Sequence, residues 1–355
     1  MVTKNTKVRA VGLLSGGLDS TLATRLMLDQ GIEVFAVNFT SPFCTCTPKS
    51  AGCPAVVTAI SQLGDIPLKR IRMGSDYLEI VKKPKFGYGA GMNPCIDCRI
   101  LKIKKAGEYM HKIGASFLFT GEVLGQRPMS QHRRAVDIIN RESGLKDYIL
   151  RPLSAAHFEP TVPEQKGWVD RSRLLGISGR SRKPQILLAS RNNITDYPCP
   201  AGGCLLTVKN FAERMRDYFA FTDHPSLKDV ELLKVGRHFR LQNHDKVIVA
   251  RDEMEGQRLE SLHGKDDHLL VPFDFAGPTV YLCGSGIQAA AEKMVHFTKQ
   301  ALDENHRDIH RCGRESKTVR LHGLLSGQAG ISQKLIVNPA PPSPKPFPPE
   351  GERTG

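Results

Sequence analysis

The chain has 355 residues, of which 40% are hydrophobic and 24% are charged. This length predicts about two domains, and the composition excludes a globally disordered chain and a coiled coil. The formal charge of +14, from 50 Lys and Arg residues against 36 Asp and Glu residues, favours polyanions such as nucleic acid as partners.

Strand-like and helix-like patterns alternate over the first 120 residues. Apolar runs at 8–14, 32–39, 66–71 and 116–120 are typical of buried strands, and residues 95–113 have the spacing of a basic amphipathic helix. Strands that alternate with helices predict a parallel sheet with helices on both faces. We therefore expect an α/β domain over residues 1–207.

The pattern changes in the second half of the chain. Shorter elements predict a smaller α+β domain over residues 208–304. Residues 305–355 lose periodicity and contain the proline-rich run 338–349, so we expect a basic, disordered tail. The arginine-rich stretch 157–183 is either a solvated loop or a surface that faces RNA.

The segment Ser15–Ser20 lies where the first strand ends and the first helix begins, a position that favours anion binding. Gly16 and Gly17 let the backbone approach a phosphate closely, and the two serines add hydroxyl donors. Asp19 is a suitable ligand for a nucleotide-bound Mg²⁺ ion. Residue identity excludes a Walker loop and a dinucleotide fingerprint.

This segment resembles the SGGxDS motif of the PP-loop ATP pyrophosphatase superfamily. The resemblance implies an adenine nucleotide alpha hydrolase-like fold that cleaves ATP between its α and β phosphates and adenylates a carbonyl oxygen. It also implies that ATP contacts the loop, the backbone at the end of the second strand and a Thr–Gly pair after a later strand. The residues implied are Ser15, Gly16, Gly17, Leu18, Asp19, Ser20, Phe39 and Gly121.

The nine cysteines are too few for a disulfide scaffold, and with no signal-peptide pattern they favour metal or thiol chemistry in the cytoplasm. No apolar run reaches the about 18 residues of a membrane span, so we expect no membrane partner. Cys95 and Cys98 lie one turn apart at a helix start, where the dipole favours thiolates. Cys204 follows a flexible Gly–Gly pair that lets it approach the same site.

Residues 93–98, Asn-Pro-Cys-Ile-Asp-Cys, together with Cys204, resemble the catalytic cysteine elements of tRNA uridine thiolases, the 2-thiouridylases and 4-thiouridine synthetases. The resemblance implies an ATP-dependent tRNA sulfurtransferase that adenylates a uridine carbonyl and replaces its oxygen with sulfur. Asp19, Cys98 and Cys204 are then the catalytic residues. The sulfur donor is a cysteine desulfurase, a persulfide carrier or free sulfide.

Two sulfur-transfer schemes fit these cysteines. In one, Cys98 and Cys204 relay a persulfide. In the other, similar to the iron–sulfur-dependent thiolases of the superfamily, Cys95, Cys98 and Cys204 hold a 4Fe–4S cluster with one open iron. Cys95 favours the cluster, because a two-cysteine relay has no need of it. Zinc is a further possibility, with Cys44, Cys46 and Cys53 as ligands.

The C-terminal domain resembles the NFACT-R type of RNA-associated domain, on residues 234–237 and 248–251. Within the loop after the fourth strand, Gln126 and Arg127 are candidates for substrate contact. Two other classes of function stay open. One is another PP-loop enzyme, such as a deazaguanine nitrile synthase with a structural zinc site, and the other is a noncatalytic RNA-binding protein that keeps the fold.

Overall fold

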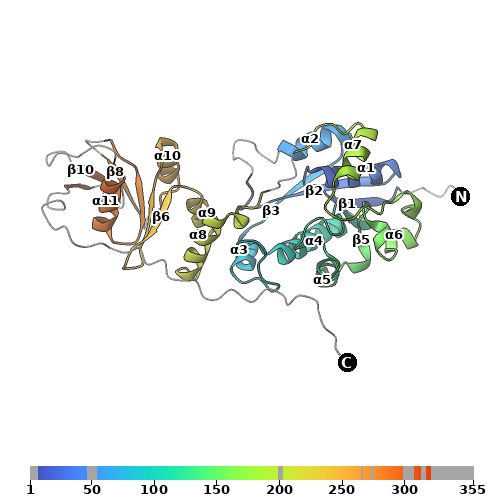
Figure 1. The fold of residues 1–355 in the computed structure, drawn as a ribbon, viewed down its shortest axis with the longest axis horizontal. Coiled ribbons are helices and arrows are strands. Elements are labelled where there is room, and N and C mark those ends of the chain that lie inside the picture. The colour runs from blue at the N-terminus through green and yellow to red at the C-terminus, as the bar shows by residue number, and fades with distance from the viewer. Residues whose placement is uncertain are drawn as a thin grey trace, which may run out of the picture. The chain divides into compact units, whose positions relative to one another are not determined.

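The computed structural model describes residues 7–45, 54–198, 203–264, 267–272 and 276–298, and the backbone of residues 308–312 and 317–320. The chain forms two compact units that divide between Lys209 and Asn210 (Figure 1). Within the described residues, no helix has the length and apolar character needed to cross a membrane.

The N-terminal unit is built on a parallel sheet of five strands in the order β3-β2-β1-β4-β5. Its strands are β1 (Arg9–Leu13), β2 (Glu33–Thr40), β3 (Leu68–Arg72), β4 (Phe117–Thr120) and β5 (Ile149–Leu150). The strand order changes direction beside β1, so the carboxyl ends of β1 and β4 flank the crevice in which such sheets bind ligands.

Helices cover both faces of this sheet, as the alternation of strands and helices predicts. One core contains side chains of α1 (Leu18–Asp29), α2 (Pro54–Leu63) and α7 (Lys183–Arg191). The opposite core contains side chains of α4 (Cys95–Lys112) and α5 (Arg133–Ser143). The remaining helices of this unit are α3 (Ser75–Lys82) and α6 (Val162–Gln165).

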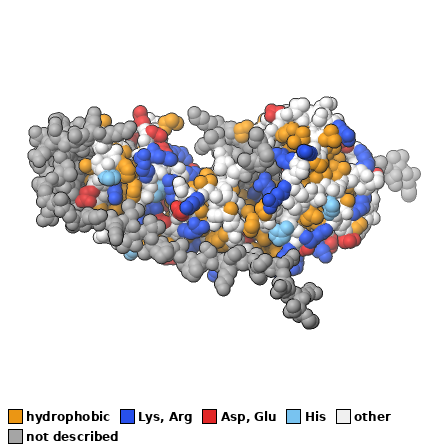
Figure 2. Space-filling view, viewed as in Figure 1, with side chains coloured by type: hydrophobic (Ala, Val, Ile, Leu, Met, Phe, Trp, Pro, Cys, Tyr) orange, Lys and Arg blue, Asp and Glu red, His pale blue; other side chains and the backbone are white. Residues whose placement is uncertain are grey.

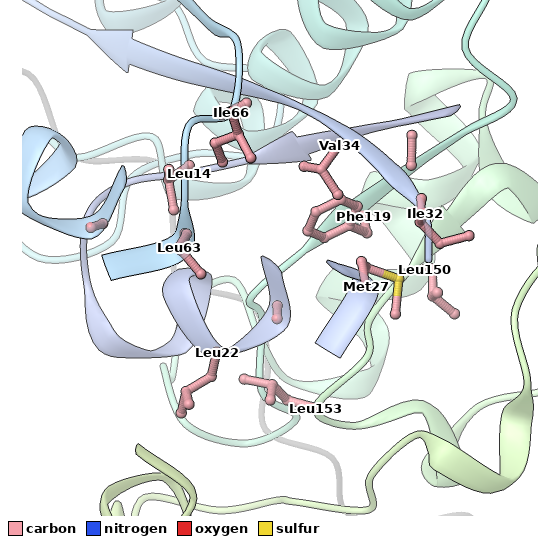
Figure 3. Packing of buried hydrophobic residues seen from close by; sticks show 14 of the residues in the cluster. Leu14, Leu22, Met27, Ile32, Val34, Leu63, Ile66, Phe119, Leu150 and Leu153 are labelled. Atoms are coloured by element: carbon pink, nitrogen blue, oxygen red, sulfur yellow. The ribbon is translucent and has the colours of Figure 1, made fainter. Parts of the chain in front are cut away.

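Strand residues alternate between these two cores because successive side chains of a strand point to opposite faces. Phe117 and Phe119 of β4 pack on the α1 side, whereas Leu118 packs on the α4 side. Figure 3 shows Phe119 beside Val34 and above Met27 of α1. The expected α/β class is confirmed, and the expected helix over 95–113 matches α4 to within one residue.

The C-terminal unit contains an antiparallel sheet of six strands in the order β11-β10-β8-β9-β7-β6. Helices pack on both faces of it, α11 on one and α9 and α10 on the other. Its strands are β6 (Arg237–Arg240), β7 (Lys246–Val249), β8 (His268–Pro272), β9 (Val280–Cys283), β10 (Asp308–Cys312) and β11 (Lys317–Arg320). Its helices are α8 (Lys209–Ala220), α9 (Leu227–Leu233), α10 (Glu253–Ser261) and α11 (Ile287–His296).

Strands β10 and β11 correct one expectation. They lie within residues 305–355, where the sequence pattern predicted only a disordered tail. Each strand is at most five residues long and rich in charged residues, so no apolar alternation marks it. Backbone pairing places these residues in strands, because β10 pairs with β8 and β11 pairs with β10. The proline-rich run lies outside the described residues.

Candidate nucleotide and thiol site

The loop between β1 and α1 is held by its own serine hydroxyl groups. The Ser20 hydroxyl donates to the Gly17 carbonyl at 2.8 Å and lies 3.1 Å from the Ser15 hydroxyl. The Ser15 backbone N–H donates to the Ser20 hydroxyl at 3.2 Å. Leu18 is fully buried in the core and anchors the start of α1. The loop is therefore preorganised at a helix N-terminus, where backbone N–H groups attract anions.

Two glycines of this site have no room for a side chain. Gly16 has a φ of 80°, and a Cβ atom there would lie 2.4 Å from the Ala55 carbonyl carbon at the start of α2. A Cβ atom on Gly121 would lie 2.5 Å from the Ser20 Cα atom. The carboxyl end of β4, at Thr120–Gly121, therefore packs closely against the Ser15–Ser20 loop. Both glycines are required by close backbone approach.

Asp19 lies at the start of α1 with its two carboxylate oxygens in different environments. Oδ2 accepts a hydrogen bond of 2.8 Å from the Gln126 side chain. Oδ1 is buried and has no hydrogen-bond partner among the described residues. Gln126, a candidate for substrate contact from the sequence, therefore contacts Asp19 in the structure. An unpartnered buried carboxylate oxygen is unusual and fits a metal ligand.

The end of β2 lies beside the loop. The buried Asn38 side chain donates to the Leu14 carbonyl at 2.9 Å, and its own oxygen has no partner among the described residues. Phe39 follows at the same carboxyl edge of the sheet, with its ring packed against the core on the α4 side. The Phe39 backbone therefore lies at the carboxyl edge of the sheet, beside the Ser15–Ser20 loop.

The segment around Cys204 is tied to two distant parts of the N-terminal unit. Cys44 and Cys204 form an antiparallel bridge, flanked by hydrogen bonds from Leu205 N to Phe43 O (2.8 Å) and from Thr45 N to Gly203 O (3.4 Å). Met92 N donates to Leu206 O at 2.9 Å, just before α4 begins at Cys95. These ties bring Cys204 to the cysteine end of α4.

Cys95, Cys98 and Cys204 interact electrostatically with one another. Burial, with the neighbouring Cys98, raises the pKa of Cys95 to about 11. Burial, with smaller contributions from Cys98 and Cys95, likewise raises the pKa of Cys204 to about 11. The expectation that the helix dipole makes Cys95 a thiolate is therefore wrong for the ligand-free protein, because burial outweighs the dipole. The Arg127 and Lys102 charges oppose this shift at Cys95.

These thiols do not form a site for one ion in the present arrangement. Among the described residues, no three His, Cys, Asp or Glu side chains converge closely enough to hold a single metal ion. Cys44 lies near Cys204 through the bridge, and its sulfur accepts a hydrogen bond of 3.3 Å from Ser41 N. Cys46, Cys53 and Cys199 lie outside the described residues.

Two buried residues near the thiols were missed by the sequence reasoning. The Tyr77 hydroxyl donates to Cys98, and burial together with this sulfur raises the pKa of the tyrosine well above its ordinary value. Asp97 accepts hydrogen bonds from Lys85 N (3.0 Å) and Phe86 N (3.1 Å) and so fixes the preceding loop to α4. Asp97 could have been identified from the sequence, because a charged residue between Cys95 and Cys98 on a buried helix face needs hydrogen-bond partners.

A buried ion-pair network follows Gly121 in the chain. Glu122 accepts from Arg99 Nε at 2.6 Å and from Arg151 Nε at 2.9 Å, and its side chain is 2% exposed. Burial by itself raises the pKa of Glu122, but the two arginine charges outweigh it and hold the pKa below its ordinary value. The carboxylate is thus charged and fully paired.

Comparison with known families matches the two units separately. Residues 5–162 match the family model described as thiamine biosynthesis protein (ThiI). Residues 236–321 match the model described as NFACT protein RNA binding domain. That second match includes β10 and β11, so these strands belong to the same region as the rest of the C-terminal sheet.

Curated relatives share the N-terminal match. The tRNA-specific 2-thiouridylase MnmA of Francisella tularensis subsp. tularensis (strain WY96-3418) is 27% identical over 244 residues, covering 63% of this chain and 62% of the relative. The probable tRNA sulfurtransferase of Thermoanaerobacter sp. (strain X514) is 34% identical over 151 residues, covering 42% and 37%. The chain thus spans less than two thirds of the length of these relatives.

Solved structures give weaker likenesses. A 4-thiouridine synthetase–RNA complex with bound ATP is 20% identical and has a TM-score of 0.35, with 64% of this chain and 52% of that chain covered. The U34-tRNA thiolase NcsA from Methanococcus maripaludis with its [4Fe-4S] cluster is 19% identical, with a TM-score of 0.32 and coverages of 65% and 74%.

The family matches confirm the resemblance expected from the sequence motifs. Both matched ranges fall where the motifs lie, the Ser15–Ser20 loop in the first and residues 248–251 in the second. Residues 5–162 are therefore similar to the ThiI family, and residues 236–321 are similar to the NFACT protein RNA binding domain.

Proposed function

We propose that this chain is an ATP-dependent tRNA uridine sulfurtransferase. The observation that carries the proposal is that one short loop contacts the phosphate-binding half of the site and acts electrostatically on the thiol half. Gln126 donates to Asp19 of the phosphate-type loop, and the charge of the next residue, Arg127, acts on the Cys95 thiol. A site that activates a carbonyl oxygen with ATP therefore adjoins a group of thiols. The ThiI-type match over residues 5–162 supports the same reaction.

The loop residues Ser15 to Ser20 bind the phosphates of ATP in this proposal, and Gly121 lets β4 pack closely behind them. The backbone at Phe39 contacts the adenine. Mg²⁺ fits Asp19 Oδ1, because this oxygen is buried and without a partner among the described residues. The uridine carbonyl oxygen attacks the α-phosphorus and pyrophosphate leaves. Sulfur then adds to the activated carbon, and AMP departs with the original oxygen.

Cys95, Cys98 and Cys204 would hold a 4Fe–4S cluster in this proposal. They lie within electrostatic reach of one another, and a cluster takes each thiolate on a different iron. A bound cluster with one open iron would supply a site for the sulfur that attacks the uridine. Arg127 and Lys102 favour the thiolate form of Cys95, and the Tyr77 hydroxyl hydrogen-bonds Cys98.

The RNA substrate is bound by positive charge on both units in this proposal. Arg180 and Lys183 are exposed near the start of α7, whereas Arg171 and Arg173 of the same basic stretch bind the Phe158 and Asp29 carbonyl groups. Figure 2 shows lysine and arginine side chains gathered on the visible face of the C-terminal unit, which matches an NFACT RNA-binding domain. Phosphate contacts of this kind make binding salt-dependent.

Anaerobic purification followed by iron, acid-labile sulfide and zinc analysis tests the sulfur chemistry. About four irons and four sulfides per chain support the cluster. Zinc or no metal supports a persulfide relay through Cys98 and Cys204. The Cys95→Ser variant separates the two schemes, since only the cluster requires Cys95. The sulfur donor follows from thiolation assays with free sulfide, a cysteine desulfurase or a persulfide carrier.

Pyrophosphate release with unmodified tRNA tests the ATP step. The Asp19→Ala variant should abolish it, whereas Cys98→Ser and Cys204→Ser should retain it and form no thiouridine. A wild-type protein that consumes no ATP would refute the enzyme and favour a noncatalytic RNA-binding protein. Thiouridine formation by either cysteine variant would refute the assigned cysteines.

A further inference from the structure

Two glutamines form a chain of hydrogen bonds that ends on Asp19. Gln126, in the loop after β4, donates its side-chain N–H to Asp19 Oδ2 at 2.8 Å. Gln185, on α7, donates its side-chain N–H to the Gln126 oxygen at 3.2 Å. The order Gln185, Gln126, Asp19 joins three elements that are far apart in sequence.

The buried member of this chain is Gln185. Its side chain is 0% exposed, although the neighbouring Ile186 and Leu187 of α7 are exposed by 49% and 55%. A fully buried glutamine is costly unless its polar atoms are paired, and its oxygen has no partner among the described residues. Its donated hydrogen bond to Gln126 is thus the main polar contact that explains a glutamine here.

The direction of each hydrogen bond sets the direction of the next. A glutamine amide has a donor end and an acceptor end. Because the Asp19 carboxylate can only accept hydrogen bonds, the Gln126 amide turns its N–H end toward Asp19 and its oxygen toward Gln185. The Gln185 N–H group donates to this oxygen and so holds the Gln126 amide where it binds Asp19 Oδ2.

The backbone around the two glutamines is fixed by contacts of its own. Gly179 N donates to Leu124 O at 2.7 Å, and Leu124 and Ser178 form a parallel bridge. Gly125 and Gly179 both have positive φ values, of 77° and 82°, and a Cβ atom on Gly125 would lie 3.4 Å from Gly179 N. The loop that carries Gln126 is thus docked on the segment that leads into α7.

We propose that Gln126 and Gln185 are positioning residues that hold Asp19 with Oδ1 directed at the metal ion of a bound nucleotide. The proposal rests on the nucleotide-binding function proposed above. With Oδ2 occupied by Gln126, only Oδ1 is available, so the carboxylate binds the ion through one oxygen. Neither glutamine needs to touch the nucleotide.

The test measures binding rather than turnover. A fluorescent, nonhydrolysable ATP analogue is titrated into the full chain at increasing Mg²⁺, for wild type, Gln126→Leu and Gln185→Leu. We expect each variant to need about tenfold more Mg²⁺ for half-maximal binding, as for loss of one hydrogen bond to a charged group. The affinity for the analogue without Mg²⁺ should stay unchanged. Gln185→Glu should shift the Mg²⁺ requirement at least as far, because a carboxylate cannot donate to Gln126.

The control is Gln165→Leu, which makes the same substitution at an exposed glutamine that bonds the Pro160 carbonyl. Circular dichroism checks folding, and Gln126→Leu, in a partly exposed loop, serves if Gln185→Leu does not fold. An unchanged Mg²⁺ requirement in folded Gln126→Leu would overturn the inference alone. A wild-type chain that binds the analogue but shows no Mg²⁺ dependence would also overturn it. A wild-type chain that binds no nucleotide would overturn both the inference and the proposed function.

Discussion

Arg99 donates its Nε hydrogen to Glu122 at 2.6 Å and so joins the residue after Cys98 to the residue after Gly121. Gly121 packs directly on the backbone of Asp19 and Ser20. Gly121 and Glu122, two consecutive residues of one loop, therefore fix the position of the nucleotide loop relative to α4, the helix that carries Cys95 and Cys98.

Arg99→Met should uncouple the two halves of the proposed reaction. The substitution keeps the apolar stem but removes the tie to Glu122, so the end of α4 that carries Cys98 loses its fixed position. Pyrophosphate release should continue, while thiouridine formed per pyrophosphate should fall by roughly tenfold or more, since small misplacements of reacting groups cost this much. The ratio of the two products, measured on the same sample, reports the effect.

The matched control is Lys104→Met on the exposed face of the same helix. This variant should keep the wild-type ratio. An unchanged ratio in Arg99→Met would show that Arg99 does not position α4 for sulfur transfer.

Glu122→Gln should destabilise the N-terminal unit by about 3 to 5 kcal/mol, because it leaves the Arg99 and Arg151 charges in a buried site without a counter-charge. Arg151 is only 4% exposed and cannot turn to solvent. Urea unfolding followed by the fluorescence of the single tryptophan, Trp168, measures the change in this unit. A loss of less than 1 kcal/mol, within the range of a surface ion pair, would contradict it.

Mild oxidation should link Cys44 to Cys204. The flanking hydrogen bonds identify them as a non-hydrogen-bonded antiparallel pair, in which the Cα atoms lie about 4.5 Å apart, and this separation suits a disulfide. Diamide takes up the two electrons and two protons of the thiols. Burial raises the pKa of Cys204 to about 11, so linkage should speed up as pH rises above neutrality. Peptide mapping without reductant detects the linked pair.

Cys44→Ser provides the control for this linkage. It should remove the Cys44–Cys204 linked peptide. The absence of the linked peptide from oxidised wild type would mean that the two side chains do not meet in solution.

The C-terminal unit should lose stability in mild acid because of His238. Burial and the charges of Lys246 and Arg214 lower the pKa of His238 to about 2 from its ordinary value of 6.5. Its Nε2 bonds the Val235 carbonyl at 2.7 Å, and its Nδ1 is buried without a partner in the described part of the chain. Below pH 6.5 the unfolded state gains a proton that the folded state does not, so stability falls by at most about 1.4 kcal/mol per pH unit.

His238→Gln keeps an N–H donor for Val235 but cannot titrate. Urea unfolding by circular dichroism at pH values on either side of 6.5 should therefore show a weaker acid loss in this variant than in wild type. Trp168 fluorescence separates the unfolding of the N-terminal unit. Equal acid losses in both proteins would refute the role of His238.

The sequence was sufficient for features made by neighbouring residues. The Ser15–Ser20 loop and the helix from Cys95 depend on local spacing, and the structure places both as expected. The sheet followed from the alternation of strands and helices. These patterns are visible because each residue's partner lies within one or two turns of it.

Features that depend on distant partners were not visible. In the sequence, Glu122 looks like an ordinary loop residue, because its partners Arg99 and Arg151 come from distant segments. Gln185 looks like one more polar residue of an amphipathic helix, because its partner Gln126 is also distant. The Cys95 pKa was misjudged for the same reason, since burial by other segments, rather than its own helix, decides it. The spacing of residues along the sequence does not predict such contacts between distant segments.

The bridge between Cys44 and Cys204 also has a consequence for how the protein folds. The hydrogen bond within the nucleotide loop joins Ser15 and Ser20 across five residues, whereas Thr45 and Gly203 are separated by 158 positions in the chain. Long-range closures of this kind cost more entropy and form late. During synthesis the residues of the nucleotide loop therefore emerge long before Cys204, which can approach Cys95 and Cys98 only after almost the whole N-terminal unit has been made.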